Sequence, residues 1–368
     1  MRIAIVGCGQ LSRMLALAGI PMGLKFSFIN DNAQPDTTCI DGLGKVVAWQ
    51  LGDGFADLYA ALGEPDIVTI EKEQLNVELL KGLQAFCPVY PNSEAVAVCQ
   101  DRHQERLLLD KLNIPCSEYI YGEPLDVCAK KLALPLVIKS CREGYDGKNQ
   151  WVLRTAGDAV ALEAEFAGTQ PVNRDYIAEQ FVAFDCEVSQ VSARTRSGEI
   201  CHYPLAENQH EKGILRQSIA PAPAATDHLQ ALAQQYTTSI ANALNYVGVL
   251  AVEFFVCGEQ LLVNELAPRV HNSGHWTQSG SQTCQFENHL RAITDAALGS
   301  TKPHGVAGMV NLIGIEKPSL STLSANSKLY WYDKSVRAGR KLGHMNFDAA
   351  DVETLTQKMS AFRETIDT

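Results

Sequence analysis

The sequence between Val249 and Trp276 constrains this chain more than any other stretch. Two segments, LAVEFFV and QLLVNEL, are apolar and rich in β-branched and aromatic residues, and Cys257-Gly258-Glu259 separates them, which predicts a tight β-hairpin. Each predicted strand carries one carboxylate, Glu253 or Glu265, and pairing of the strands would bring the two close together. Because a buried charged carboxylate is costly unless it is compensated, we expect these two to be paired, protonated or bound to a cation.

The residues around the hairpin predict a metal and phosphate site. Two hard oxygen ligands suit Mg²⁺, and Mg²⁺ usually accompanies phosphates. Directly after the second strand, Arg269, His271 and Asn272 provide donors suited to a second anion. The alternative is a hairpin whose glutamates form ordinary salt bridges. Acids on both strands, followed by these donors, favour the metal and phosphate site.

The composition is that of a globular protein with two or three domains. The chain has 368 residues, 46% of them hydrophobic, so it can bury a large core. Its net charge of −11, without a Lys/Arg run, argues against nucleic-acid binding, so local basic residues must hold any anionic substrate. The eleven cysteines form no CxxC pair, which predicts reduced thiols in a cytoplasmic protein. We find neither a signal peptide nor an apolar run that approaches the ~20 residues of a membrane span.

A strand, a glycine-bearing turn and a helix open the chain. Residues 2–6 are apolar, Gly7 to Arg13 form the turn, and residues 14–18 are helical, as in a βαβ unit whose helix N-terminus faces an anion. The pattern fits either a dinucleotide or a phosphate-sized ligand. A buried strand at residues 66–70 ends at Glu71, which we expect to line one crevice with the turn; alternatively, Glu71 lies beside a helix N-cap.

The middle of the chain carries further candidate phosphate ligands. A helix begins at Asp101, near which we expect a domain boundary, and a later strand delivers Lys139 to a glycine-bearing loop at residues 141–150. Such a loop can fold over phosphates, although it could equally be a simple hairpin turn. Strands follow at residues 176–182 and 185–194, and backbone groups of the first could meet a purine edge. Residues 208–216, with His210, are predicted to be a polar loop.

The last third of the chain is predicted to contain two helices and a basic cluster. The helices cover residues 227–246, with Asp227 as cap, and residues 285–298. Strands are expected at residues 309–313 and 328–333. Four cations then occur within eight residues, which predicts an anion pocket or, alternatively, a charged surface patch. These cations are Lys334, Arg337, Arg340 and Lys341.

Four motifs, in this order along the chain, resemble the ATP-grasp family and, within it, the 5-(carboxyamino)imidazole ribonucleotide synthases, the ATP-dependent carboxylase subunits of purine biosynthesis. The motifs are GCGQLSRM, GYDGKNQW, NELAPRVHNSGHWT and WYDKSVRAGRKLGH. The resemblance implies a mixed α/β and α+β fold with three domains. These are a Rossmann-like preATP-grasp domain at residues 1–100, an ATP-grasp domain at residues 101–298 and a small C-terminal domain at residues 299–368.

The resemblance also implies the reaction and its participants. Bicarbonate would attack the γ-phosphate of MgATP to give carboxyphosphate, and the carboxyl group would pass to the exocyclic amine of aminoimidazole ribonucleotide. We expect a homodimer that acts on small molecules and passes its product to a separate mutase, without nucleic acid or membrane partners.

Site residues follow from the resemblance by position. ATP would be bound by Arg102, Lys139, Gly144, Tyr145, Asp146, Gly147, Lys148, Asn149, Gln150, Glu179, Gln180, Phe181, Val182, Glu187, His210, Asn264 and Glu265. Mg²⁺ would be held by Glu253 and Glu265. Catalysis would involve Arg269, His271, Asn272, Tyr145 and Asp146. The ribonucleotide would be bound by Gln10, Leu11, Glu71, Lys334, Arg337, Arg340 and Lys341.

Two positions depart from the family pattern. Glu143 and Asn149 stand where the family loop has glycine. Asn149 tolerates left-handed backbone, whereas Glu143 beside a polyphosphate predicts a differently ordered loop or weaker ATP affinity.

Three other functions are alternatives to this one. A related carboxylate–amine ligase would share the ATP-binding half but not the RVHNSGH run or the basic cluster. A Rossmann dehydrogenase would use Asp31 for ribose but leaves the acidic hairpin unexplained. A non-catalytic nucleotide-binding or scaffold protein would be compatible with Glu143.

Overall fold

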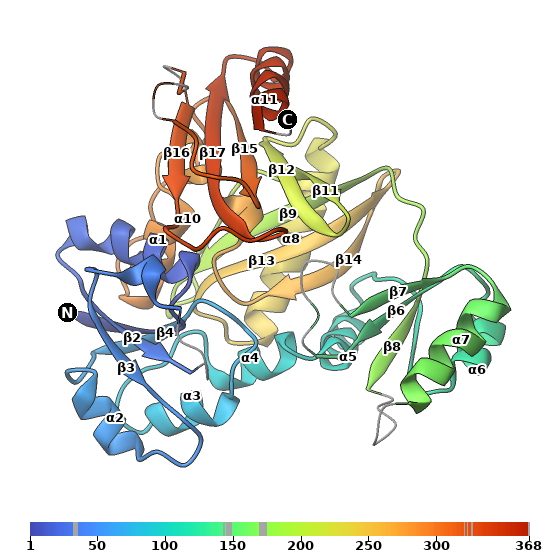
Figure 1. Cartoon of the computed structure of the whole chain (residues 1–368), viewed down its shortest axis with the longest axis horizontal. Coiled ribbons are helices and arrows are strands. Elements are labelled where there is room, and N and C mark those ends of the chain that lie inside the picture. Colours follow the sequence, from blue (N-terminus) through green and yellow to red (C-terminus); the bar gives the residue numbers. More distant parts are fainter. Residues whose placement is uncertain are drawn as a thin grey trace.

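A computed structural model describes residues 1–31, 36–142, 144, 149–168, 175–319, 321, 323–324 and 327–366. The described strands form three sheets, which are separated in Figure 1. Glu143 and four residues predicted to bind the nucleotide, Tyr145, Asp146, Gly147 and Lys148, lie outside the described residues.

The N-terminal sheet is parallel and has the order β3-β2-β1-β4 (Figure 1, blue). Parallel strands need crossover connections, and short helices supply them here. The expected βαβ unit at the N-terminus is confirmed. The strands are β1 (Arg2–Val6), β2 (Lys25–Asn30), β3 (Lys45–Ala48) and β4 (Ile67–Ile70), and the helices are α1 (Gln10–Gly19), α2 (Phe55–Ala61), α3 (Val77–Leu83) and α4 (Ser93–Cys99).

The second sheet is antiparallel, has the order β5-β8-β6-β7 and lies at the lower right of Figure 1. Two helices pack on it around a small apolar core, and a further helix, α5 (Arg102–Leu112), precedes it. Lys139 lies on strand β6, one of the two inner strands, and the prediction that a strand carries this lysine is confirmed. The strands are β5 (Tyr119–Tyr121), β6 (Leu136–Ser140), β7 (Gln150–Leu153) and β8 (Tyr176–Gln180), and the packed helices are α6 (Leu125–Lys131) and α7 (Ala156–Ala167).

The third sheet has nine strands and contains the predicted acidic hairpin. Its order is β14-β13-β9-β11-β12-β15-β17-β16, with β10 paired to β9. It continues across the domain boundary expected near residue 298, because β12 pairs with β15. The strands are β9 (Cys186–Arg194), β10 (Ile200–His202), β11 (Ala206–Glu211), β12 (Ile214–Ala220), β13 (Gly248–Cys257), β14 (Gln260–Ala267), β15 (Val306–Ile313), β16 (Ser327–Trp331) and β17 (Lys341–Ala349).

Strand β13 is buried on both faces for most of its length, which explains why its sequence is apolar on both sides of Glu253. Val249 and Ala251 belong to one apolar cluster with helix α10 (Gln285–Ile293), whereas Leu250 and Val252 belong to another with helix α8 (Asp227–Ala243). The remaining helices are α9 (Thr277–Gly280) and α11 (Val352–Ile366). No described helix has both the length and the apolar character that a membrane crossing requires.

Three local predictions are wrong. Residues 208–216 belong to the β11–β12 hairpin and do not form a loop. Their polar sequence suggested a loop because the inward-facing residues of these strands form a buried polar network in place of an apolar core. Helix α8 is capped by Thr226, which accepts a hydrogen bond from Leu229 N, and not by Asp227. Helix α10 ends at Ile293 and not at Leu298, because the chain turns through Asp295 with φ of 61°.

His289 joins the N-terminal sheet to the nine-stranded sheet. Its Nδ1 accepts from the backbone N of Val249 at 3.0 Å, and its Nε2 lies 2.8 Å from Thr69 Oγ1. Since Nδ1 is an acceptor, the neutral ring carries its proton on Nε2 and donates it to Thr69. Burial lowers the pKa of His289 to about 4.

This histidine should make the fold sensitive to acid. A pKa of about 4 lies below the ordinary 6.5, so the unfolded chain binds more protons between these values, and stability is lost as the pH falls from 6.5 to 4. His289→Gln should reduce that loss by about 2 kcal/mol between pH 7 and pH 4.5. Denaturant unfolding at pH 7 and pH 4.5 measures it. The control is His228→Gln, an exposed histidine of α8; equal acid sensitivity in both variants would contradict the assignment.

Candidate functional site

The two hairpin glutamates lie opposite each other. Glu253 of β13 and Glu265 of β14 are register partners, and a β-bulge follows directly. Burial and the charge of Glu265 raise the pKa of Glu253 to about 7. His271 Nε2 lies 3.6 Å from Glu253, and Arg102 Nη2 lies 3.1 Å from Glu265. The raised pKa of Glu253 indicates that neighbouring positive charges do not fully balance the two carboxylates, so the pair fits a divalent cation.

A cation held here would need ligands other than protein side chains. Among the described residues, no group of three or more His, Cys, Asp or Glu could hold a metal ion. Mg²⁺ characteristically takes one or two carboxylates together with phosphate oxygens and water. The donor set of Glu253 and Glu265 agrees with that pattern.

A buried ion network lies beside Glu265 on strand β14. Lys139 Nζ is 2.7 Å from Glu179 Oε2 and donates to Asn264 Oδ1 at 3.1 Å. Arg106 Nη2 lies 2.7 Å from Glu179 Oε1 and donates to Asn264 O at 2.8 Å. Burial opposes the charge of Glu179, but Arg106 and Lys139 outweigh it and keep the pKa of Glu179 below its ordinary value. Burial also lowers the pKa of Lys139.

Helix α5 connects the two sheets through charged residues on one face. Arg102, Glu105 and Arg106 share this face, since they are three and four residues apart. The backbone N of Arg102 donates to Cys141 O at 2.9 Å, and Glu105 accepts from Leu266 N at 2.9 Å. Burial raises the pKa of Glu105 to about 8. The spacing of the Lys139 strand from the Glu265 strand thus depends on α5. Sequence reasoning missed Glu105 and Arg106, although both occur in a predicted helix beside Arg102.

The end of strand β8 and the neighbouring strands form the region expected to bind the nucleoside. Glu187 Oε2 lies 2.7 Å from His210 Nδ1. Burial lowers the pKa of His210, but the hydrogen bond to Glu187 and the negative charges of Glu253 and Glu187 together outweigh burial and raise the pKa. Gln180 ends β8, Phe181 is exposed and Val182 is half-buried. Asn149 has φ of 54°, a left-handed conformation that Asn tolerates. Gln150 follows it as the first residue of β7, where it pairs with Lys139, and Gly144 lies outside any helix or strand.

The turn after β14 holds an arginine and two further polar side chains. Arg269 forms a two-point ion pair with Glu73, with Nη2 to Oε1 at 3.0 Å. Sequence reasoning missed Glu73, two residues after Glu71. Gln285 accepts from His271 N at 2.9 Å and donates to His271 O at 2.7 Å, which fixes the backbone. Both polar atoms of the Asn272 side chain are buried without a hydrogen-bond partner among the described residues. Such unsatisfied groups indicate a ligand site.

The N-terminal turn accommodates a carboxylate of the protein itself. Glu71 accepts hydrogen bonds from the backbone N of Gly9 and, at 2.9 Å, from Ser12 N. A Cβ at Gly7 would lie 2.4 Å from Glu71 Cγ, so the glycine allows Glu71 to approach. Glu71 thus occupies the helix N-terminus that a dinucleotide pyrophosphate would need. Asp31, expected to bind ribose in a dehydrogenase, is paired with Lys72 at 2.7 Å. The dehydrogenase alternative is not supported.

The four cations after β16 face different neighbours. Lys334 Nζ donates to Gln10 Oε1, and Arg340 pairs with Asp36 at 2.6 Å. Lys341 begins β17, and its charge acts on Glu253 and His271. Arg337 is exposed and Leu11 is buried. An anion pocket at Lys334 and Arg340 would therefore lie between the C-terminal segment and the N-terminal sheet, beside Gln10.

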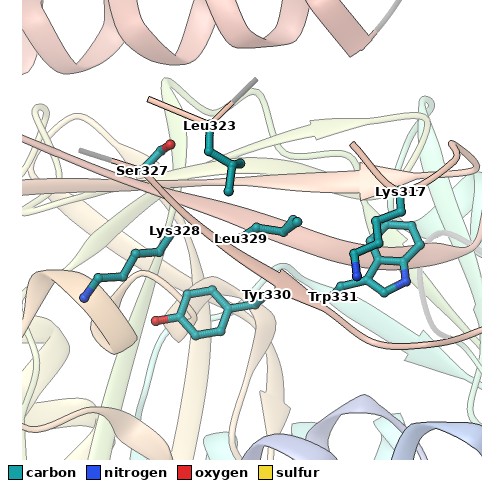
Figure 2. A pocket seen from close by; sticks show the side chains of 7 residues that line it. All are labelled: Lys317, Leu323, Ser327, Lys328, Leu329, Tyr330 and Trp331. Carbon is teal, nitrogen blue, oxygen red and sulfur yellow. The ribbon is translucent and has the colours of Figure 1, made fainter. Parts of the chain in front are cut away.

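A hollow along β16 is separate from this site. Its volume is about 460 Å³, and it is open to solvent. Figure 2 shows the side chains that line it. None of its lining residues belongs to the predicted site. They are Lys317, Leu323, Ser327, Lys328, Leu329, Tyr330 and Trp331.

Three family models match consecutive parts of the chain. The ribonucleotide synthetase preATP-grasp domain matches residues 1–100, the ATP-grasp domain residues 107–286, and the phosphoribosylaminoimidazole carboxylase C-terminal domain residues 307–358. Together with the observed sheets, these matches confirm the predicted fold class.

Known proteins are similar over the full length. N5-carboxyaminoimidazole ribonucleotide synthase of Pseudomonas aeruginosa is 42% identical, covering 98% of both chains. The Escherichia coli enzyme of that name is 37% identical, covering 98% of this chain and 94% of its own. The crystal structure of N5-carboxyaminoimidazole ribonucleotide synthetase from Thermus thermophilus has a TM-score of 0.91 at 41% identity, covering 100% and 99%. The Aspergillus clavatus enzyme, crystallised with ADP and 5-aminoimidazole ribonucleotide, has a TM-score of 0.87 at 25% identity, covering 100% and 98%.

The buried network predicts a large effect for Arg106→Met. Removal of one partner from a fully buried ion pair leaves Glu179 undercompensated, and we expect a loss of about 3–5 kcal/mol in the free energy of unfolding. Arg291→Met is the matched control, because Arg291 forms a partly exposed pair with Glu287 on one helix. That variant should lose less than about 1 kcal/mol. Denaturant titration at pH 7 compares them, and equal losses would contradict a special role for the network.

Proposed function

The chain belongs to the N5-carboxyaminoimidazole ribonucleotide synthase family of ATP-grasp ligases, and we propose that the acidic hairpin and the turn after it perform the two halves of that family's reaction. The protein is an ATP-dependent ligase that carboxylates 5-aminoimidazole ribonucleotide in purine biosynthesis.

One observation carries the assignment of roles. Glu253 and Glu265 are register partners within the hairpin. Asn264, which contacts Lys139, immediately precedes Glu265, and the turn with Arg269 follows strand β14. Phosphates held at Lys139 would therefore meet an anion held at the turn across the two carboxylates. The opposed carboxylates fit Mg²⁺, which would neutralise phosphate charge and orient the transferred group.

The first half is phosphoryl transfer. A bicarbonate oxygen attacks the γ-phosphorus of ATP, the bond to the β,γ-bridging oxygen breaks, and ADP leaves with that electron pair. The product is carboxyphosphate. Lys139, Arg102 and backbone groups of the loop at residues 144–150 would hold the phosphates, while the end of β8, Glu187 and His210 would bind adenosine. Because the transition state is stabilised mainly by positioning and charge, no covalent intermediate with the protein is needed.

The turn would bind bicarbonate and then carboxyphosphate. Arg269 is kept in place by Glu73 and is fully ionised, so it can neutralise the new anion. Burial keeps the pKa of His271 well below its ordinary value, which makes this side chain a neutral hydrogen-bond donor at neutral pH. The unsatisfied amide of Asn272 offers one further donor and one acceptor.

The second half is carboxyl transfer. The amine nitrogen of the ribonucleotide attacks the carboxyl carbon, the bond from carbon to the phosphate oxygen breaks, inorganic phosphate leaves, and the amine loses one proton. Gln10, Leu11 and Glu71 would contact the heterocycle. Lys334, Arg337, Arg340 and Lys341 would bind the ribonucleotide phosphate. The contacts of Lys334 with Gln10 and of Arg340 with Asp36 support a pocket between the N-terminal sheet and the C-terminal segment.

Other parts of the proposal rest on the family resemblance. They comprise Mg²⁺ as the metal, a homodimer, transfer of the product to a separate mutase, a cytoplasmic location, and domain boundaries at residues 100 and 298. All eleven cysteines are free, and six of them are buried, which supports a reducing environment.

ADP release tests the substrate assignment. We expect rapid ADP formation only when bicarbonate and 5-aminoimidazole ribonucleotide are both present with MgATP. Turnover that does not depend on the ribonucleotide would contradict the assigned acceptor. Formate or amino acids in place of bicarbonate serve as controls, because a related ligase would accept one of them.

The carboxylate variant tests the hairpin. Glu265→Gln preserves shape but removes one negative charge from the metal site, so ATP turnover should fall at least about 100-fold while the unfolding transition is retained. Glu259→Gln, in the exposed turn of the same hairpin, should leave turnover unchanged. Unaltered turnover in Glu265→Gln would show that the hairpin acids serve the fold alone.

A further inference from the structure

A row of buried polar side chains leads from His271 across the nine-stranded sheet. Ser273 Oγ lies 2.9 Å from His271 Nδ1, and Ser189 Oγ lies 2.7 Å from Ser273 Oγ. Asn208 Nδ2 lies 3.0 Å from Ser189 Oγ, and Ser218 Oγ lies 2.7 Å from Asn208 Oδ1. These residues come from the turn and from the adjacent strands β9, β11 and β12, and all are buried.

The hydrogen bonds of this row run in one direction. The hydroxyl of Ser218 donates to the Asn208 carbonyl, the Asn208 amide donates to Ser189, and the hydroxyl of Ser189 donates to Ser273. The Ser273 hydroxyl proton is then free to be donated to His271 Nδ1. The backbone N of Ser273 also donates to this nitrogen, at 3.4 Å.

Two donors therefore face Nδ1 of His271, and the neutral ring must carry its proton on Nε2. Nε2 is the nitrogen that faces Glu253, at 3.6 Å. Ser189 is itself the register partner of Glu253 on the neighbouring strand, so the row begins directly beside the acidic hairpin in the same sheet.

The row needs an explanation beyond folding. Apolar residues would fill the middle of a sheet at a lower desolvation cost, whereas a buried polar network is stable only when each member is satisfied. Every member here has a partner, and the row ends at the one ring nitrogen that does not face the hairpin.

We propose that Ser273, oriented by Ser189, Asn208 and Ser218, is a positioning residue that fixes His271 as the Nε2–H tautomer, so that His271 donates this proton in a hydrogen bond to an oxygen of the bicarbonate or carboxyphosphate. The acceptor rests on the proposed function, but the tautomer rests on the geometry of the protein alone. The row keeps Nδ1 occupied, so His271 stabilises the anion without taking a proton from it.

The tautomer can be measured on the full chain without substrates. Two-bond ¹H–¹⁵N spectra of [¹⁵N]histidine-labelled protein at pH 7.5 distinguish protonated from unprotonated ring nitrogens, and comparison with His271→Asn assigns the signal. The proposal predicts an unprotonated Nδ1 and a protonated Nε2 for His271. A protonated Nδ1 in the unaltered protein would overturn it, whatever the activity.

Ser273→Ala tests the consequence for turnover. Loss of one donor to Nδ1 should mix the two tautomers and lower the kcat of ADP formation roughly five- to tenfold, with KM for ATP within about twofold of the unaltered value. Ser189→Ala, which leaves Ser273 in place, should lower kcat by a smaller factor and remains informative if Ser273→Ala fails to fold.

The matched control is Ser192→Ala. Ser192 lies on the same strand β9 and makes the same kind of contact, 2.7 Å from His202 Nδ1. It should leave the His271 signal and kcat unchanged. If Ser273→Ala keeps both the signal and kcat, or if Ser192→Ala changes them equally, the proposal fails. If His271 has its proton on Nε2 but the protein does not use bicarbonate, the proposed function is contradicted, while the role of Ser273 in positioning His271 remains supported.

Discussion

The buried carboxylate of Glu179 and its two cations are the interaction on which the nucleotide site depends. Glu179 lies on one sheet, and Arg106, from helix α5, also contacts the backbone of Asn264 on the other sheet. Buried charged groups are tolerated only when their ion-pair partners are accurately placed. The network therefore fixes how the strand of Lys139 faces the strand of Glu265, and with it the distance between phosphate ligands and metal ligands.

The same principle explains how an acidic protein can bind several anions. Three of the site cations are held by an acid or by a polar neighbour: Arg269 by Glu73, Arg340 by Asp36, and Lys334 by Gln10. These partners orient the cations before the substrate arrives, which lowers the reorganisation needed on binding. The histidine at the turn is kept neutral by burial, so His271 contributes a directed N–H group in place of another charge.

The hairpin and the N-terminal βαβ unit could be predicted because their signals are local. Apolar runs rich in β-branched and aromatic residues, a glycine turn and opposed acids specify β13 and β14, and the register pairs Glu253 with Glu265 as the pattern indicated. Strand β11 was missed because Asn208 and its neighbours look like a loop when their long-range partners are unknown. Glu73, Arg106 and Ser273 were missed for the same reason: each acts on a residue distant in sequence or through a single directed hydrogen bond, which residue spacing does not reveal. Glu71 was assigned to a crevice, but its role in capping α1 became clear only from the structure.

The central claim is that bicarbonate meets the γ-phosphate of ATP at the acidic hairpin, and oxygen tracing tests it most directly. The protein is given ¹⁸O-labelled bicarbonate, MgATP and 5-aminoimidazole ribonucleotide in unlabelled water, and the released phosphate is analysed before the label exchanges. The account predicts one bicarbonate oxygen in each phosphate, because the oxygen that attacks phosphorus leaves with it. Phosphate without ¹⁸O would show that water or another nucleophile attacks ATP, and it would contradict the account.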